Sequence, residues 1–245
     1  MRLPNLGQLR TGAPGAAPFG FADRQGRAFV FVIADGYPEK GIHEPLVLVL
    51  RHKGQHGAYG IPGGLQDASD HGKLLTTALR EFAEEWLNIP KEVKDPKTHK
   101  KMDNQQAQKF AVQTLLQQSY DGVRGSTTNL HPTRPPMGTY VIRVHSALDF
   151  EKMSAMFNDN IKHGASRKDK LKVPYLSTEI NGHAWITQSA IKEAIATQTL
   201  DNYGRLLVKT THDPNVRLPI RDYVFGHYGS KGKWEPNRFT KVHFL

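Results

Sequence analysis

The chain has 245 residues, a length that suits one large domain with a buried core, or one domain with substantial insertions. It contains no cysteine, which excludes disulfide bonds and cysteine-ligated zinc and favours a reducing compartment. We therefore expect a cytoplasmic location, with the mitochondrial matrix as the alternative. The formal net charge of +10 suits a polyanionic partner, and no apolar run reaches the roughly 20 residues that a membrane span requires, so we expect no membrane partner.

The first half of the chain begins with a segment rich in Pro, Gly and other small residues, and we expect residues 1–24 to be a flexible lead-in. Apolar, β-branched runs at 27–34 and 45–52 predict two strands joined by a turn-rich loop. The stretch "AYGIPGG" predicts a short strand that enters a Gly-Pro turn. A helix over about 72–88 follows, with a core-facing stripe of Leu75, Leu79, Phe82 and Trp86.

The second half continues the alternation of helices and strands. In chain order we expect an exposed connection over 90–103, a helix over 104–120, a loop, a strand over 138–145, a short helix and a basic loop within 146–178, a short strand at "HAWIT", and a helix over 188–197. This order predicts an α/β or α+β fold. We expect one domain over 25–200 with insertions at about 90–137 and 146–178, followed by a basic, aromatic extension over 201–245.

The helix that follows the glycine turn carries an unusual concentration of acid. Glu81 shares a helical face with both Glu84 and Glu85, and like charges at that spacing repel each other. These carboxylates lie off the apolar stripe and come directly after Arg80. Mg²⁺ prefers oxygen ligands and is usually held by a few carboxylates together with substrate phosphates. The pattern therefore predicts a divalent metal held against phosphate, whereas the alternative is an acidic helix end in solvent.

This stretch resembles the signature of the Nudix hydrolases, which runs Gly, five residues, Glu, seven residues, then Arg-Glu-apolar-x-Glu-Glu-x-Gly-apolar. "REFAEE" (80–85) matches the second half residue for residue, and Gly64 matches the leading glycine. The similarity extends over about 27–198, although the motif itself covers some 25 residues. It implies an α/β/α sandwich with a mixed sheet and a loop–helix–loop motif.

The sequence departs from this signature at two places. The interval from Gly64 to Arg80 is two residues longer, and Asp70 stands where the signature has its first glutamate. Leu87 replaces the closing glycine, and Asn88 after it is a residue type that adopts the left-handed conformation. The first departure counts slightly against hydrolytic activity, and the second mainly affects the shape of the loop after the helix.

The resemblance implies hydrolysis of a diphosphate that links a nucleoside to another group, with Mg²⁺ or Mn²⁺ as cofactor. By family analogy Glu81 and Glu85 bind metal directly, helped by Glu84, the Gly63 carbonyl and Asp70. Arg80 orients a glutamate through a charge-assisted hydrogen bond. The general base comes from the helix or from a later loop, where Glu179 is our choice. The expected catalytic residues are thus Arg80, Glu81, Glu84, Glu85 and Glu179.

The substrate that we expect is ADP-ribose or a similar nucleotide sugar, because "IPGG" and "REFAEEWLN" are similar to mitochondrial-type ADP-ribose pyrophosphatases. Tyr59, Tyr175 and Trp185 are candidates for stacking an adenine, although aromatic residues of this kind are more often part of the core. The expected substrate-binding residues are Gly63, Gly64, Arg51 and Tyr59.

Two other functions stay open. The segment from Tyr203 onward interleaves Lys and Arg with aromatic residues, a pattern typical of single-strand RNA binding, and it favours an enzyme that trims RNA 5′ ends. The same aromatic residues are equally suited to anchoring the C-terminal segment onto the domain. The third possibility is a Nudix scaffold that binds nucleotide or RNA without turnover. A homodimer is compatible with each of these functions.

Overall fold

A computed structural model gives the fold and describes residues 25–53, 57–94, 98–128, 136–157, 180–213, 215–229 and 232–245. The predicted lead-in over 1–24, Glu179 and Tyr175 lie outside these described residues. Of the helices in the described part, none has the length and apolar character needed to cross a membrane.

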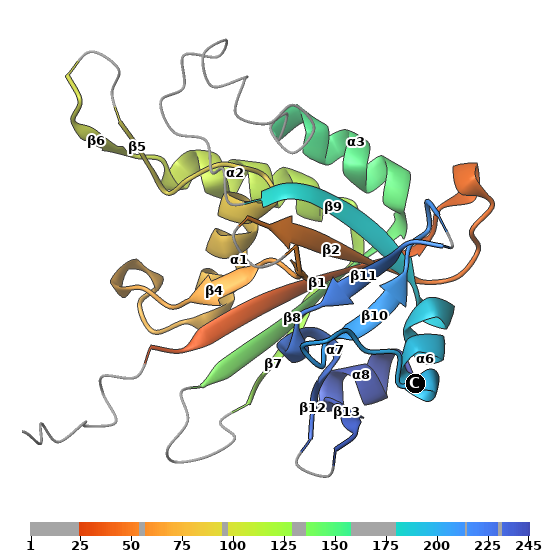
Figure 1. Ribbon diagram of the computed structural model, residues 1–245. Helices are drawn as coiled ribbons and strands as arrows, with labels where there is room; N and C mark the ends of the chain where they lie inside the picture. Colours follow the sequence, from red (N-terminus) through yellow and green to blue (C-terminus); the bar gives the residue numbers. More distant parts are fainter. Residues whose placement is uncertain are drawn as a thin grey trace, which may run out of the picture.

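One large mixed sheet forms the centre of the molecule (Figure 1). Its strands are β1 (Arg27–Gly36), β2 (Leu46–His52), β3 (Tyr59–Gly60), β4 (Gly63–Leu65), β7 (Ser119–Thr128), β8 (Met137–Ser146), β9 (Ile180–Thr187), β10 (Leu206–Lys209) and β11 (Arg217–Ile220). The order along the sheet is β10-β11-β3-β2-β1-β8-β7, with β4 paired to β1 and β9 paired to β2. The pairs β1–β8 and β11–β3 are parallel and the others are antiparallel, so the predicted mixed sheet is confirmed.

Helices cover both faces of this sheet (Figure 1). On one face lie α1 (Leu74–Glu85), α2 (Gln105–Leu116) and α3 (Ala147–Phe157), and on the other lie α6 (Gln188–Thr197), α7 (Asp222–Phe225) and α8 (Arg238–His243). The remaining elements are η3 (Pro38–Lys40), η4 (Ala68–Asp70) and two hairpins, β5 (Glu92–Lys94) with β6 (Lys101–Asp103) and β12 (Gly226–Tyr228) with β13 (Trp234–Pro236). The expected α/β/α sandwich is therefore the observed architecture.

Strand β1 shows why two cores form. Its side chains alternate between the faces, as strand geometry requires. Ala28, Val30 and Val32 belong to the core under α1, whereas Phe29 and Phe31 belong to the core under α6 to α8. A strand that is apolar on both faces has to be covered on both faces, and this is why the run is continuously hydrophobic.

The helix α1 is shorter than predicted, and one residue of its predicted stripe is wrong. Phe82 and Trp86 are buried in the core and Leu79 packs against it, as predicted, whereas Leu75 is 40% exposed and Leu74 faces the sheet instead. The spacing of four residues is right, but the stripe begins one residue earlier. Asn88 after the helix has φ 51°, the left-handed conformation that the sequence predicts.

The other predicted elements are largely found, with two notable differences. The helix over 188–197 has the predicted bounds, but residues 119–128, predicted to end a helix and form a loop, are strand β7. Despite its turn-forming residues, this segment pairs antiparallel with β8, and tertiary pairing therefore overrides its local preference. Trp185, a candidate for stacking adenine, is fully buried in the core, so that role is wrong.

The C-terminal segment is the second difference, because residues 201–245 complete the domain. β10 and β11 extend the main sheet, and Phe225, Trp234 and Phe244 are buried in the core beneath α6. Tyr203 and Tyr228 of the same segment are exposed. The structure thus favours the interpretation in which most of these aromatic residues anchor the segment.

Candidate active site

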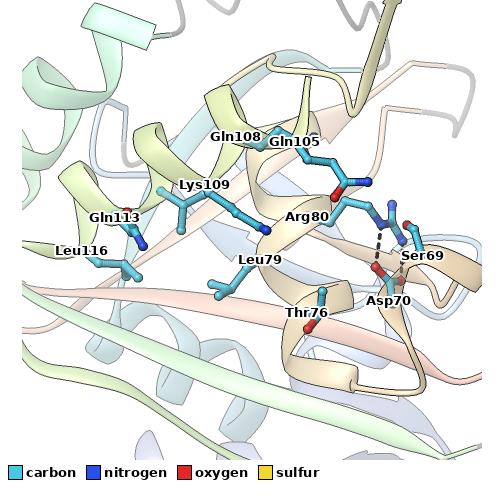
Figure 2. Close-up of a pocket in the computed structure, with 11 residues that line it drawn as sticks. Ser69, Asp70, Thr76, Leu79, Arg80, Gln105, Gln108, Lys109, Gln113 and Leu116 are labelled. Carbon is cyan, nitrogen blue, oxygen red and sulfur yellow. Dashed lines mark hydrogen bonds and ion pairs between the residues drawn. The ribbon is translucent and has the colours of Figure 1, made fainter. Parts of the chain in front are cut away.

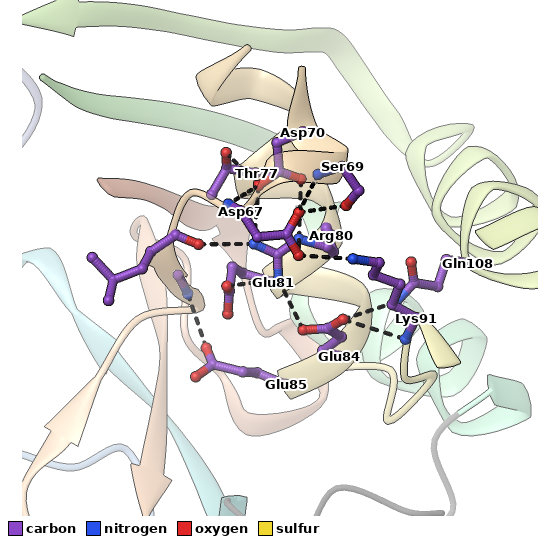
Figure 3. A network of polar contacts seen from close by, with 12 residues as sticks. Asp67, Ser69, Asp70, Thr77, Arg80, Glu81, Glu84, Glu85, Lys91 and Gln108 are labelled. Atoms are coloured by element: carbon purple, nitrogen blue, oxygen red, sulfur yellow. Dashed lines mark hydrogen bonds and ion pairs between the residues drawn. The ribbon is translucent and has the colours of Figure 1, made fainter. Parts of the chain in front are cut away.

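The acidic helix α1 carries a polar network centred on Arg80 (Figure 3). Arg80 Nη1 donates to Glu81 Oε1 at 2.8 Å and to Glu84 Oε2 at 3.0 Å, and Nη2 donates to the Leu65 carbonyl at 2.8 Å. Nε and Nη2 donate to the two oxygens of Asp70, each at 3.0 Å. All five N–H donors of a guanidinium are thus used, and Arg80 fixes two glutamates with respect to the preceding loop.

Asp70 holds Arg80 from the loop side. Its carboxylate is 1% exposed and also accepts hydrogen bonds from the Asp67 backbone N–H and from Thr77 Oγ1, both at 2.9 Å. Burial favours a higher pKa for Asp70, but these hydrogen bonds and the Arg80 charge lower the pKa below its ordinary value. Both oxygens are engaged by protein donors, an arrangement that fits a positioning role better than the metal-ligand role that we expected.

Local hydrogen bonds stabilise the lengthened loop between Gly64 and α1. Asp67 caps η4 in a reciprocal capping box with Asp70, and Ser69 Oγ donates to Asp67 Oδ1. Lys91, which follows the helix, donates from Nζ to Asp67 Oδ2 at 2.9 Å. The loop before α1 is therefore tied to the segment after it. The spacing of Asp67 and Asp70 is the sequence signal from which this box was predictable.

Glu84 also contacts the segments that follow the helix. Its Oε1 accepts weaker hydrogen bonds from the Lys91 backbone N–H at 3.3 Å and from Gln108 Nε2 at 3.4 Å. Gln108 comes from α2, so Glu84 joins three elements at one point. No sequence pattern near the motif pointed to Gln108.

Glu81 lies beneath the glycine turn. A Cβ built on Gly64 would approach the Glu81 carboxylate carbon to 2.5 Å, so only glycine leaves room for this carboxylate. Burial raises the pKa of Glu81 to about 7, an effect that Arg80 opposes and Glu84 reinforces. The glycine at position 64 thus has a steric reason, which is the close packing of Glu81.

Glu85 turns away from Arg80 and toward the turn (Figure 3). The Gly63 backbone N–H donates to Glu85 Oε2 at 2.9 Å, and His52 Nδ1 lies 3.5 Å from Glu85 Oε1. Burial, aided by the nearby Arg221, lowers the pKa of His52 to about 4, so the imidazole is neutral at pH 7. His52 lies on β2 before the motif and Arg221 in the C-terminal segment, and no local pattern connects either residue with Glu85, which is why sequence reasoning missed them.

The predicted substrate residues Arg51 and Tyr59 lie on neighbouring strands, and Tyr59 packs against the core beneath α6 to α8. Arg51 and Tyr59 are cross-strand partners in β2 and β3, Arg51 exposed and Tyr59 half-buried. A cavity of about 240 Å³ lies at another side of α1, between α1 and α2 (Figure 2). Arg80 and Asp70 line one end of it, and Lys109 of α2 points into it.

The network carries more negative than positive charge. It contains two cationic side chains, Arg80 and Lys91, and five carboxylates, two of which are buried; the carboxylates are those of Asp67, Asp70, Glu81, Glu84 and Glu85. Hard oxygen donors with an excess of negative charge fit a divalent cation. In the described part of the chain, no three His, Cys, Asp or Glu side chains converge on one point as ready metal ligands.

Known proteins resemble this chain only in structure. No protein-family model matches the chain, and no curated protein matches it. The structure is similar to a C. elegans Ap4A hydrolase (12% identity, 69% of this chain and 84% of that chain, TM-score 0.35) and to a NUDIX hydrolase from Alicyclobacillus acidocaldarius (18%, 71% and 84%, 0.34). It is also similar to the NUDIX domain of Shewanella oneidensis NrtR solved with ADP ribose (12%, 73% and 82%, 0.34).

Two of these structures are named as a NUDIX hydrolase and as a NUDIX domain, and the third is named as an Ap4A hydrolase. At these TM-scores and identities the alignments carry no argument about family or activity.

Proposed function

We propose that the protein is a metal-dependent hydrolase that splits the diphosphate linkage of a nucleoside diphosphate derivative, with ADP-ribose or a similar nucleotide sugar as substrate. The observation that carries this proposal is the arrangement of three glutamates of α1: Glu81 packs under Gly64 and Glu85 accepts a hydrogen bond from the Gly63 N–H, while Arg80 holds Glu81 and Glu84. A solvent-exposed acidic helix end explains neither the five-donor use of Arg80 nor the steric need for Gly64.

Glu81, Glu84 and Glu85 would hold Mg²⁺ or Mn²⁺. A bound ion of this kind neutralises the charge that develops on phosphoryl oxygens and lowers the pKa of an attacking water. The chain itself supplies the positioning: Thr77 donates to Asp70, Asp70 fixes Arg80, and Arg80 in turn fixes Glu81 and Glu84. Glu81, with its raised pKa, is half-buried under Gly64, and Glu85 is bound to the Gly63 N–H.

The choice of substrate rests on the similarity of "IPGG" and "REFAEEWLN" to ADP-ribose pyrophosphatases. RNA is the weaker alternative, because Phe225, Trp234 and Phe244 pack in the core and cannot stack bases. The net charge of +10 and the exposed Tyr203 and Tyr228 are what still favour it.

The deciding experiment is a product assay over ADP-ribose, NADH, dinucleoside polyphosphates, nucleoside triphosphates and capped RNA, each with Mg²⁺, Mn²⁺ or EDTA. We expect metal-dependent release of AMP from ADP-ribose and no product in EDTA. Preferred cleavage of capped RNA would favour 5′-end trimming. Binding of nucleotide without turnover of any substrate would favour the non-catalytic scaffold.

A binding measurement keeps the metal hypothesis separate from activity. Addition of Mn²⁺ should raise the melting temperature of the wild-type protein, because a ligand that binds only the folded state stabilises it. The shift should be lost in Glu84→Gln and Glu85→Gln. An equal shift in all three proteins would remove these two glutamates from the metal site.

A further inference from the structure

Arg221 lies at the junction of β11 (Arg217–Ile220) and α7 (Asp222–Phe225). Its backbone N–H donates to the Tyr59 carbonyl at 2.9 Å, and its Nη1 donates to Tyr223 Oη at 2.9 Å. The Tyr223 ring stacks on Phe29, with ring centroids 4.7 Å apart. The backbone of Arg221 is therefore fixed to β3, and its guanidinium is fixed to a tyrosine whose ring packs on Phe29.

The other nitrogen atoms of this guanidinium have no hydrogen-bond partner in the described part of the chain. Arg221 Nε and Nη2 are buried without a hydrogen-bond partner among the described residues, and so is Nε2 of His52, a residue only 7% exposed. Buried polar atoms without partners are rare in folded proteins because each costs its full desolvation free energy. Several such atoms in one cluster indicate a place where a ligand supplies the missing partners.

The position of this cluster connects it to the glutamates. His52 links the two groups: its Nδ1 is 3.5 Å from Glu85 Oε1, and the charge of Arg221 is near enough to contribute, after burial, to the lowered pKa of His52. A Cβ on Gly60 would lie 2.8 Å from Tyr223 Oη and 3.1 Å from Arg221 Cδ. Glycine at this position thus permits Arg221 and Tyr223 to occupy the space beside the site.

We propose that Arg221 binds a phosphate group of the substrate through Nε and Nη2, beside the Glu85 end of the site. The inference rests on the proposed function for the identity of the ligand. The planar guanidinium presents paired N–H donors that match the oxygens of a phosphate, and it stays charged at every physiological pH. The C-terminal segment then supplies a substrate-binding residue in addition to its part in the core.

The test measures binding of ADP in EDTA by calorimetry, so that its outcome does not depend on metal or on turnover. We compare the wild type with Arg221→Gln, Arg221→Lys and the matched control Arg217→Gln, which removes the same charge from an exposed position of β11. We expect a Kd about 10- to 100-fold higher for Arg221→Gln, which is the range for hydrogen bonds to charged groups. Arg221→Lys should fall in between, and the control should stay within about twofold of the wild type, the change expected for a distant charge in buffer.

Kinetics with ADP-ribose separate this inference from the proposed function. An increase in KM in the same order of variants supports both. Full turnover with unchanged KM and Kd in a folded Arg221→Gln overturns the Arg221 site and leaves the hydrolase intact. ADP binding that depends on Arg221, without hydrolysis of any diphosphate, supports the site and overturns the hydrolase. Failure of the wild type to bind ADP overturns the site.

Discussion

Asp70 is the residue whose replacement tests the polar network most directly. In Asp70→Asn the side chain keeps its shape but loses its charge, and its amide N–H₂ replaces one of the two oxygens that now accept four hydrogen bonds. At least one donor, on Arg80, Thr77 or Asp67, then faces another donor. The perturbation thus removes the partner of a cation that is itself only 11% exposed in its side chain.

The expected loss is large because the pair is buried. Removing one partner of a buried ion pair costs about 3–5 kcal/mol, and the asparagine oxygen that still accepts hydrogen bonds keeps the loss near the lower end, about 3 kcal/mol. Thr77→Val removes a single hydrogen bond to the same carboxylate and should cost about 1 kcal/mol. The two variants together separate the charge from the hydrogen bond.

The assay is urea unfolding monitored by circular dichroism, and the m value of each variant is compared with the wild-type m value. The matched control is Asp121→Asn, which removes a surface partner of Arg124 and should change the free energy of unfolding by less than about 1 kcal/mol. If Asp70→Asn is no less stable than this control, the Arg80–Asp70 pair does not hold the loop. The reasoning on the positioning of Glu81 and Glu84 would then fail with it.

Three further predictions concern single residues. Glu85→Gln should reduce metal-dependent turnover by at least about 100-fold while the melting temperature stays near the wild-type value, because the glutamine oxygen still accepts from Gly63; wild-type turnover would exclude Glu85. In Gly64→Ala the new Cβ displaces the flexible end of Glu81, so activity assays should show a far greater loss than thermal melting; unchanged activity would contradict the close packing. Glu151 is buried, which favours a higher pKa, but hydrogen bonds from His183, Trp185 and Tyr37 lower it to about 2. Its contribution to stability is therefore complete above its ordinary value of 4.5 and is lost as the pH falls toward 2. Acid titration of Glu151→Gln should show a flatter loss of stability over this interval, and a curve parallel to the wild type would refute the assignment.

The sequence determined those features that depend on local chemistry. Continuous β-branched runs predicted β1 and β2, the apolar spacing predicted α1, and the left-handed preference of Asn88 predicted how α1 ends. The four-residue spacing also placed Arg80 beside Glu84, since helix geometry alone brings such residues together. Each of these features depends on residues that are close together in the sequence.

The tertiary structure decided what distant segments do to one another. Strand β7 forms because β8 offers it a pairing edge, and the C-terminal segment becomes core because β10 and β11 extend the sheet. His52 and Arg221 meet beside Glu85 although they are separated by most of the chain. No local pattern encodes such a meeting, because it depends on the order of strands in the sheet and on burial that exists only in the folded domain.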